Sequence, residues 1–399
     1  MLNRHLEKAV SFAKQKVADR STETAEQAAR EQIAKLRAAA REGAEPILKV
    51  GNYDRAEHEA SLGLSIPHLM AFKPVSYQLV GWPHRITDTR ELARYADHNF
   101  EAEIAGLFEP GAHFDPVGYR NAFTYDEMEL VGGVRETVRN FTAKWFGRRV
   151  APVSNILVQV GPFRMVDQIK SAFGLSEVSL FEAGPGAGYL GAFLATSGQR
   201  YTSFDVAQSY YLWQSCLMQA TGGEDFAEIA GLDEPTAKLA AAESRVVHLP
   251  WWRFVNFLTG PAPRADIVYS NSNLAEMSRV SLRMLLHVSK TILSDSEAGV
   301  FTFFSKGMPA QTPHEQIDEE FKIFGYHKVF EEPFHAYVLD PDKAEVIAKA
   351  FENGILDYDP SGRAGSLSAQ KVTPLTPDEA PLDTQLTQWY HGWQPPFSD

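Results

Sequence analysis

A group of glycines between two acidic residues is the part of the sequence best suited to bind a ligand. Glu182 ends an apolar run, and Gly184, Gly186 and Gly188 follow it before an amphipathic segment. Glycines at a strand-to-helix turn let the backbone approach a ligand closely and present N–H groups at the start of the helix. A second apolar run ends at Asp205, where a carboxylate can accept hydrogen bonds from both hydroxyls of a ribose. The spacing therefore predicts a site for a nucleoside-containing cofactor.

Two spacing patterns fit these glycines. Gly186, Gly188 and Gly191 satisfy G-x-G-x-x-G, the pattern of a dinucleotide site, which would make the chain a nicotinamide-dependent oxidoreductase. That frame leaves Gly184 and Glu182 without a role. In the frame E-x-G-x-G-x-G each of these residues has a place, so we favour the second frame and keep the first as the alternative.

The favoured frame resembles motif I of class I S-adenosylmethionine-dependent methyltransferases, and the resemblance covers roughly residues 165–340. It implies S-adenosyl-L-methionine as cofactor, approached by the three glycines of the motif. It also implies that Glu182 helps to hold the amino-acid end of the cofactor and that Asp205 takes the ribose hydroxyls. The segment after the fourth strand, with Asn271 and Glu276, is similar to the same part of a bacterial subgroup of sugar O-methyltransferases.

The adenine contact departs from the wider family's pattern. That family often has an acid after the third strand, whereas this chain has His248-Leu249-Pro250-Trp251-Trp252. The indole face of Trp251 offers a substitute platform for the adenine ring. We therefore include Trp251, and Asn271 after the fourth strand, among the expected cofactor contacts. An Asn-capped turn is the alternative reading of Asn271.

Transfer of a methyl group to an alcohol benefits from a general base. Glu276 and His248 are the candidates, because both follow strand ends, where open α/β sheets build their sites. The structural alternatives are a helix N-terminal acid favoured by the macrodipole for Glu276 and a strand-end core histidine for His248.

Short apolar runs alternating with helical segments after Gly161 predict a parallel sheet with helices on both faces. The runs at 326–330 and 335–339 are too close for a helical crossover, so this pair must be antiparallel. The predicted fold class is α/β: a doubly wound seven-stranded sheet of the Rossmann-like methyltransferase type, with an antiparallel last strand and a mainly helical N-terminal extension. The preceding five strands are expected at residues 178–183, 201–204, 245–249, 265–270 and 299–304.

The remaining length predicts additions to this sheet. Within them, residues 124–146 are the clearest helical stretch, with an interruption expected at Gly132 and Gly133. We expect four regions: an amphipathic helix or helix pair (1–45), a mainly helical accessory or lid region (46–164), the cofactor-binding domain (165–345) and a C-terminal extension (346–399).

Composition excludes several partners. The 399 residues carry 38 basic and 51 acidic side chains, a formal charge of -13, so no basic surface is expected for nucleic acid. Cys216 is the one cysteine and cannot form an intramolecular disulfide. No apolar run reaches the ~20 residues of a membrane span, and no signal-like h-region is present, so we expect a cytoplasmic protein without membrane partners. The sequence contains no group of residues with the spacing of metal ligands, so it does not predict a metal site.

These patterns together predict a methyltransferase that uses S-adenosyl-L-methionine to O-methylate a small hydroxylated molecule, such as a sugar. The acidity favours a neutral or cationic substrate. The first helix suggests a homodimer. A methyltransferase-like protein that binds without catalysis is the alternative from another class.

Overall fold

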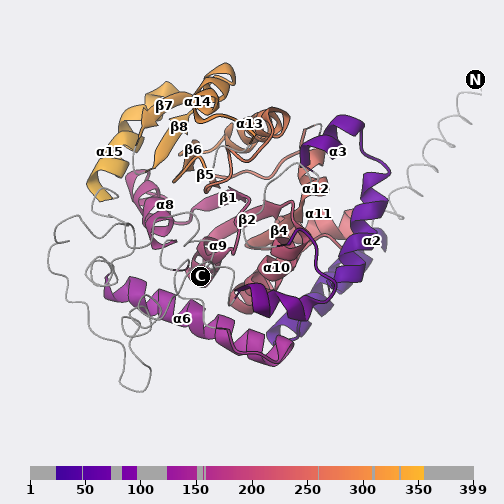
Figure 1. The fold of residues 1–399 in the computed structure, drawn as a ribbon. Helices are drawn as coiled ribbons and strands as arrows, with labels where there is room; N and C mark the ends of the chain where they lie inside the picture. The colour runs from indigo at the N-terminus through magenta and orange to yellow at the C-terminus, as the bar shows by residue number, and fades with distance from the viewer. Residues whose placement is uncertain are drawn as a thin grey trace, which may run out of the picture.

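The structure is a computed structural model in which residues 24–46, 48–72, 83–96, 124–150, 156, 159–258, 260–307, 311–331 and 334–354 are described. A single twisted sheet lies between two layers of helices (Figure 1). The expectations for residues 1–23 and for the tail from 355 onward lie outside the described residues.

The sheet contains eight strands in the order β3-β4-β2-β1-β5-β6-β8-β7. All neighbouring strands from β3 to β6 run parallel, whereas β8 runs antiparallel to both β6 and β7. The strands are β1 (Ser179–Ala183), β2 (Arg200–Asp205), β3 (Phe226–Glu228), β4 (Val246–Pro250), β5 (Ile267–Ser270), β6 (Val300–Phe303), β7 (His327–Phe330) and β8 (His335–Val338).

This topology confirms the predicted doubly wound sheet with an antiparallel last strand. The predicted number of seven strands was wrong, because the three-residue strand β3 adds an eighth at the edge beside β4. The central strands β4, β5 and β6 are buried along their whole length. Strands covered on both faces are read as continuous apolar runs, which is why the sequence located them.

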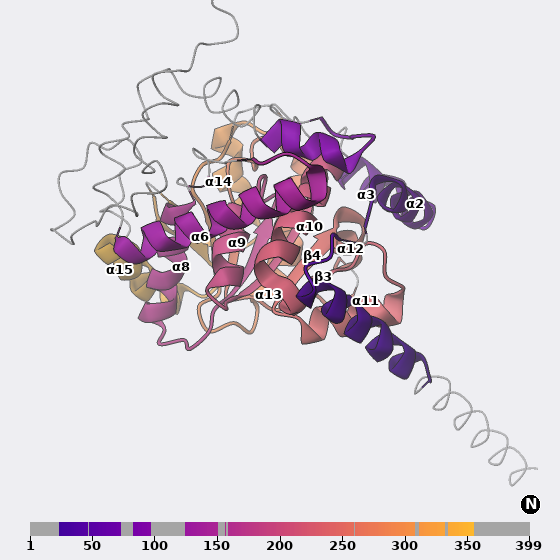
Figure 2. The ribbon, with the colours of Figure 1, turned by 90° about the horizontal axis from the view of Figure 1, so that it is seen from below.

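Helices on one face are α8 (Val160–Ala172), α9 (Tyr189–Thr196) and α10 (Gln208–Gly222), and α6 (Tyr125–Phe141) packs across α9 and α10 (Figure 2). Against the other face pack α12 (Trp251–Asn256), α13 (Arg279–Leu293) and α14 (His314–Ile323), and α3 (Ile66–Phe72) contacts α12 and α13. The last described helix, α15 (Ala344–Gly354), packs against α8 and β7.

The helix expected at 124–146 is not interrupted at its two glycines. Thr124 caps α6 in a reciprocal capping box with Glu127, and the helix continues to Phe141 before one π-helical turn, Thr142–Phe146. The expected break at Gly132 and Gly133 was therefore wrong. The cap and the packing of α6 on α9 and α10 outweigh the modest cost of glycine in a helix.

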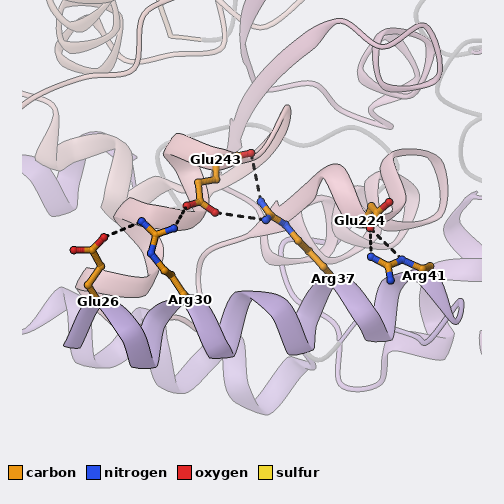
Figure 3. Close-up of polar contacts among 6 residues, drawn as sticks. All are labelled: Glu26, Arg30, Arg37, Arg41, Glu224 and Glu243. Atoms are coloured by element: carbon orange, nitrogen blue, oxygen red, sulfur yellow. Dashed lines mark hydrogen bonds and ion pairs between the residues drawn. The ribbon is translucent and has the colours of Figure 1, made fainter. Parts of the chain in front are cut away.

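Residues 24–41 form a helix that docks on its own domain (Figure 3). Arg30 pairs with Glu243, at the end of α11 (Glu234–Glu243), at 3.0 Å, and Arg41 pairs with Glu224 just before β3. Two apolar side chains of this helix, Ala29 and Ile33, are buried. Each exposed ion pair contributes roughly 0–1 kcal/mol. The homodimer stays a prediction, which a light-scattering mass would test.

Near the glycine turn, helix α9 approaches the sheet closely at Gly191. A Cβ placed there would lie 2.4 Å from the Tyr201 ring on β2, which is fully buried. Gly133 in α6 is the matched control, because no atom beyond the neighbouring backbone of α6 lies within 4 Å of a Cβ at that position.

We expect Gly191→Ala to lower the free energy of unfolding by about 1–3 kcal/mol, because the methyl group overpacks this contact. Gly133→Ala should raise it, by up to about 1 kcal/mol, because alanine is the better helix former. Urea unfolding of both variants measures these changes. Equal effects of the two substitutions would contradict the close approach.

Candidate active site

The carboxyl ends of the parallel strands meet at one edge of the sheet. Ala183, the last residue of β1, is paired with Phe204 of β2 and with Ser270, the last residue of β5. Asp205 at the end of β2 is paired with Pro250 at the end of β4. The loops that carry most of the predicted site residues therefore emerge side by side, as expected for an open α/β sheet.

The turn after β1 has the backbone that its glycines predict. Gly184, Gly186 and Gly188 have φ angles of 66°, 57° and 75°, in the left-handed region that side chains other than glycine rarely adopt. Gly188 is the N-cap residue of α9. Apart from Gly186 itself and its two chain neighbours, no described residue has an atom within 4 Å of a Cβ built on Gly186. The middle of the turn therefore offers its backbone to open space, while its ends are fixed.

The amide of Asn273, in the loop after β5, holds the first glycine of the turn. Its Nδ2 donates to the carbonyl oxygens of Ala183, at 2.7 Å, and Gly184, at 3.1 Å, while its Oδ1 accepts from Ser270 Oγ. A Cβ on Gly184 would lie 2.2 Å from that amide nitrogen. Gly184 thus needs to be glycine for this contact, a role that the dinucleotide frame does not give it.

The predicted contact Asn271 lies two residues before Asn273 and does not reach the turn within the described structure. Its Oδ1 accepts a hydrogen bond from Ser272 Oγ, at 3.0 Å. Ser272 has a φ of 56°, unusual for a residue other than glycine, and this bend separates the two asparagines. The sequence offers both asparagines at the same strand end, and the reversal of the chain decides which one faces β1.

Asp205 is buried at the end of β2 and its carboxylate is held by two donors. The Ala207 N–H donates to Oδ1 at 3.0 Å, and Gln214 Nε2 donates to Oδ2 at 2.8 Å. Burial raises the pKa of Asp205 to about 6, although these hydrogen bonds act in the opposite direction. At pH 7 the carboxylate is therefore largely ionised and able to accept hydrogen bonds from a ligand.

Glu182 lies behind the turn, 1% exposed, rather than in open space. Its Oε2 accepts a hydrogen bond of 2.6 Å from the hydroxyl of Tyr201. Burial raises the pKa of Glu182 to about 8, although the hydrogen bond from Tyr201 opposes this shift. The carboxyl group is mostly protonated at neutral pH and braces β1 against β2, so any effect on a cofactor's amino-acid end would pass through the turn.

His248 lies in the core rather than on the cleft surface. Its ring is fully buried, stacks on the Tyr211 ring at a centroid distance of 4.0 Å, and its Nδ1 lies 2.9 Å from Ser203 Oγ. Burial lowers the pKa of His248 to about 3. The pairing of His248 with Ser203 across β4 and β2 directs the ring inward, so we do not retain His248 as a base.

Trp251 is equally buried, at the start of α12. Its Nε1 donates to Glu57 Oε1 at 2.8 Å, and Glu57 belongs to α2 (Val50–Ser61), which packs against α12. Its ring also meets that of Trp252 edge to face. The indole that the sequence offered as an adenine platform is thus covered by the accessory region and anchors α2 to the sheet domain.

Glu276 follows Asn273 in the loop after β5 and is only partly buried. Among the described residues none donates a hydrogen bond to its carboxylate. Burial raises the pKa of Glu276 to about 7. A carboxyl group with a pKa near the working pH is suited to general base catalysis. Of the two predicted bases, Glu276 therefore has the accessible and usable position.

A cavity of about 560 Å³ lies between helix 24–41, α2 and the edge strand β3, with Ile33, Leu36 and Trp252 among its lining residues. None of the predicted site residues lines it. In the described ranges, no three His, Cys, Asp or Glu side chains gather as metal ligands would. No helix within those ranges has the length and apolarity to cross a membrane.

Comparisons with known proteins find structural similarity alone. No protein-family model matches the sequence, and no curated protein matches it. Magnesium protoporphyrin IX methyltransferase from Synechocystis PCC 6803, with bound SAM, is 13% identical over 53% of this chain and 97% of that chain, with a TM-score of 0.29. A TehB-like SAM-dependent methyltransferase from Corynebacterium glutamicum is 12% identical over 44% of this chain and 86% of that chain, with a TM-score of 0.28.

The glycopeptide N-methyltransferase MtfA, complexed with sinefungin, is 10% identical over 44% of this chain and 85% of that chain, with a TM-score of 0.28. The solved structures to which this chain is similar thus include methyltransferases. At these low scores the assignment of the fold rests on the order and directions of the strands themselves.

The raised pKa of Glu182 predicts a pH-dependent stability. A carboxyl group with a pKa near 8 when folded and 4.5 in its ordinary state contributes stability below pH 4.5 that is lost as the pH rises toward 8. Glu182→Gln removes this dependence. The unfolding temperature of the variant minus that of the wild-type protein should therefore increase from pH 5 to pH 8.5.

Thermal unfolding across that pH range measures the difference. The exposed Glu59→Gln on α2 is the control, because it removes one acid without emptying a buried site. A difference between Glu182→Gln and wild type that stays constant with pH would contradict a buried, protonated Glu182.

Proposed function

We propose that this chain binds S-adenosyl-L-methionine at the turn after β1 and transfers its methyl group to a small hydroxylated molecule. One observation carries the proposal. Three glycines with left-handed backbone conformations lie at the end of β1, and the ionisable Asp205 lies at the end of the neighbouring strand. This pairing suits a ligand that has both a ribose and a group requiring close backbone approach.

The residues present fit this cofactor. The open space beside Gly186 leaves room for a ligand against the backbone, and Asp205 presents an acceptor for ribose hydroxyls. The formal charge of -13 favours a ligand that carries a positive sulfonium. When bound, the cofactor supplies a methyl group already activated by the positively charged sulfur.

The protein's own contribution is positioning and proton removal. Holding the acceptor and the cofactor in line replaces a bimolecular encounter by an oriented one. Glu276 is the group that we assign to accept the proton of the acceptor hydroxyl, since half of its carboxyl groups are ionised near pH 7. Its loop is tied to the glycine turn through Asn273, three residues earlier.

The alternatives are less well supported. A nicotinamide-dependent oxidoreductase is not favoured. The contact with Asn273 requires glycine at position 184, and the G-x-G-x-x-G frame gives Gly184 no role. Gly191 serves helix packing in either frame. A non-catalytic binding protein would share the cofactor site, and only methyl transfer separates it from our proposal. A hydroxyl group as methyl acceptor, and a sugar as its carrier, belong to this proposal as expectations from the sequence.

S-adenosylhomocysteine should raise the unfolding temperature of the wild-type protein by several degrees. At a concentration of 100 times Kd, binding adds about 2.7 kcal/mol to the free energy of unfolding. Gly186→Ala should lose this shift, because its methyl group enters the open space of the turn. NADH should produce no shift.

Gly174→Ala is the matched control, since Gly174 has a φ of 63° and open surroundings but lies before β1, remote from the turn. Both substitutions strain the backbone by about 1–2 kcal/mol, so both should lower the unfolding temperature without ligand. Stabilisation of the wild type by NADH alone, or the same ligand shift in both variants, would reject the proposed cofactor site.

Glu276→Gln should reduce methyl transfer by roughly 10² to 10⁴, because the general base is lost. Its affinity for S-adenosylhomocysteine should stay unchanged. The wild-type rate should fall as the pH drops below about 7, as Glu276 becomes protonated, and the variant should lack this limb. Formation of S-adenosylhomocysteine with a panel of monosaccharides and phenols measures both. A variant with the wild-type rate and pH profile would exclude Glu276 as the base.

A further inference from the structure

Gln214 of α10 connects the glycine turn to Asp205. Its side chain is 1% exposed, and its Nε2 donates to Gly186 O at 2.5 Å and to Asp205 Oδ2 at 2.8 Å. Its Cγ would lie 3.2 Å from a Cβ on Gly188, so the side chain runs directly along the turn. One amide group thus touches both parts of the proposed cofactor site.

The orientation of this amide follows from its partners. A backbone carbonyl oxygen can only accept a hydrogen bond, so the group that faces Gly186 O must be the NH₂. Its two hydrogens are used by Gly186 O and by the Asp205 carboxylate. The carbonyl oxygen, Oε1, is therefore on the other side of the amide, available only as an acceptor.

Oε1 is a buried acceptor to which no described residue donates a hydrogen bond. A buried polar atom left unpaired costs about 1–3 kcal/mol. A role confined to bracing the turn would need only the NH₂ group. Oε1 is instead an unused acceptor on the same amide group that contacts both Gly186 O and the Asp205 carboxylate.

We propose that Gln214 is a ribose-recognition residue, whose Oε1 accepts a hydrogen bond from one ribose hydroxyl while Asp205 accepts one from the other. This inference rests on the proposed cofactor site. It makes the site selective for ribonucleosides, because a ligand that lacks either hydroxyl leaves a buried acceptor unpaired. The carboxylate oxygens keep free lone pairs for this purpose, although each already accepts one hydrogen bond.

The test compares three nucleosides by calorimetric titration: adenosine, 2′-deoxyadenosine and 3′-deoxyadenosine. S-adenosylhomocysteine is titrated first. The wild-type protein should bind adenosine at least about tenfold more tightly than either deoxy analogue, since one buried acceptor loses its partner in each case. Equal wild-type affinity for all three nucleosides would overturn the inference without any variant.

Gln214→Met keeps the length of the side chain and removes both polar groups. We expect it to bind adenosine more weakly, to lose discrimination against one deoxy analogue and to keep discrimination against the other, which Asp205 provides. Gln219→Met on the same helix is the control, because Gln219 donates to Ala44 O, away from the turn. This control should retain the wild-type pattern.

The outcomes separate the two proposals. A wild-type protein that binds neither S-adenosylhomocysteine nor adenosine would reject the proposed function. A wild-type protein that binds both, with Gln214→Met weakening all three nucleosides by the same factor, would reduce Gln214 to a brace of the turn and overturn this inference alone. If Gln214→Met does not fold, equal affinity of the wild-type protein for the three nucleosides still overturns the inference.

Discussion

Two side-chain amides hold the turn after β1, and the candidate site depends on them. Asn273 donates to the carbonyl oxygens at its start, and Gln214 donates to the carbonyl oxygen at its centre and to Asp205. These contacts fix three backbone conformations that are costly for most residues and leave the middle of the turn open. The ends of strands β1, β2 and β5 lie side by side, so both amides can reach the turn.

Differences in burial and hydrogen bonding give the three acids of the candidate site different pKa values. Glu182, fully enclosed and held by Tyr201, has a pKa of about 8; Asp205, held by two donors, about 6; and Glu276, with partial burial alone, about 7. The same type of side chain is therefore a neutral brace, a charged acceptor or a group able to exchange a proton. Environment, more than residue type, divides these tasks.

Much of the fold could be predicted from the sequence, because doubly covered strands form continuous apolar runs and a short connection forces the last pair to be antiparallel. The strand β3 has only three residues and escaped that signal. The glycines and Asp205 follow from local spacing. The roles of Asn273 and Gln214 do not follow from local spacing. The contact of Asn273 depends on a chain reversal at Ser272, and that of Gln214 depends on which side of α10 faces the turn. His248 and Trp251 lie where predicted along the chain, but strand register and α2 enclose both.

The helix of residues 24–41 has a consequence for the behaviour of the sheet in solution. Its Ile33 and Leu36 line the same cavity as Phe226 of β3, a strand that pairs with β4 alone among the described strands. Open strand edges readily pair with other chains. The helix, which is held by exposed arginine–glutamate pairs, therefore also protects this edge of the sheet from aggregation with other chains. That protection weakens in concentrated salt, where such pairs are screened (Figure 3).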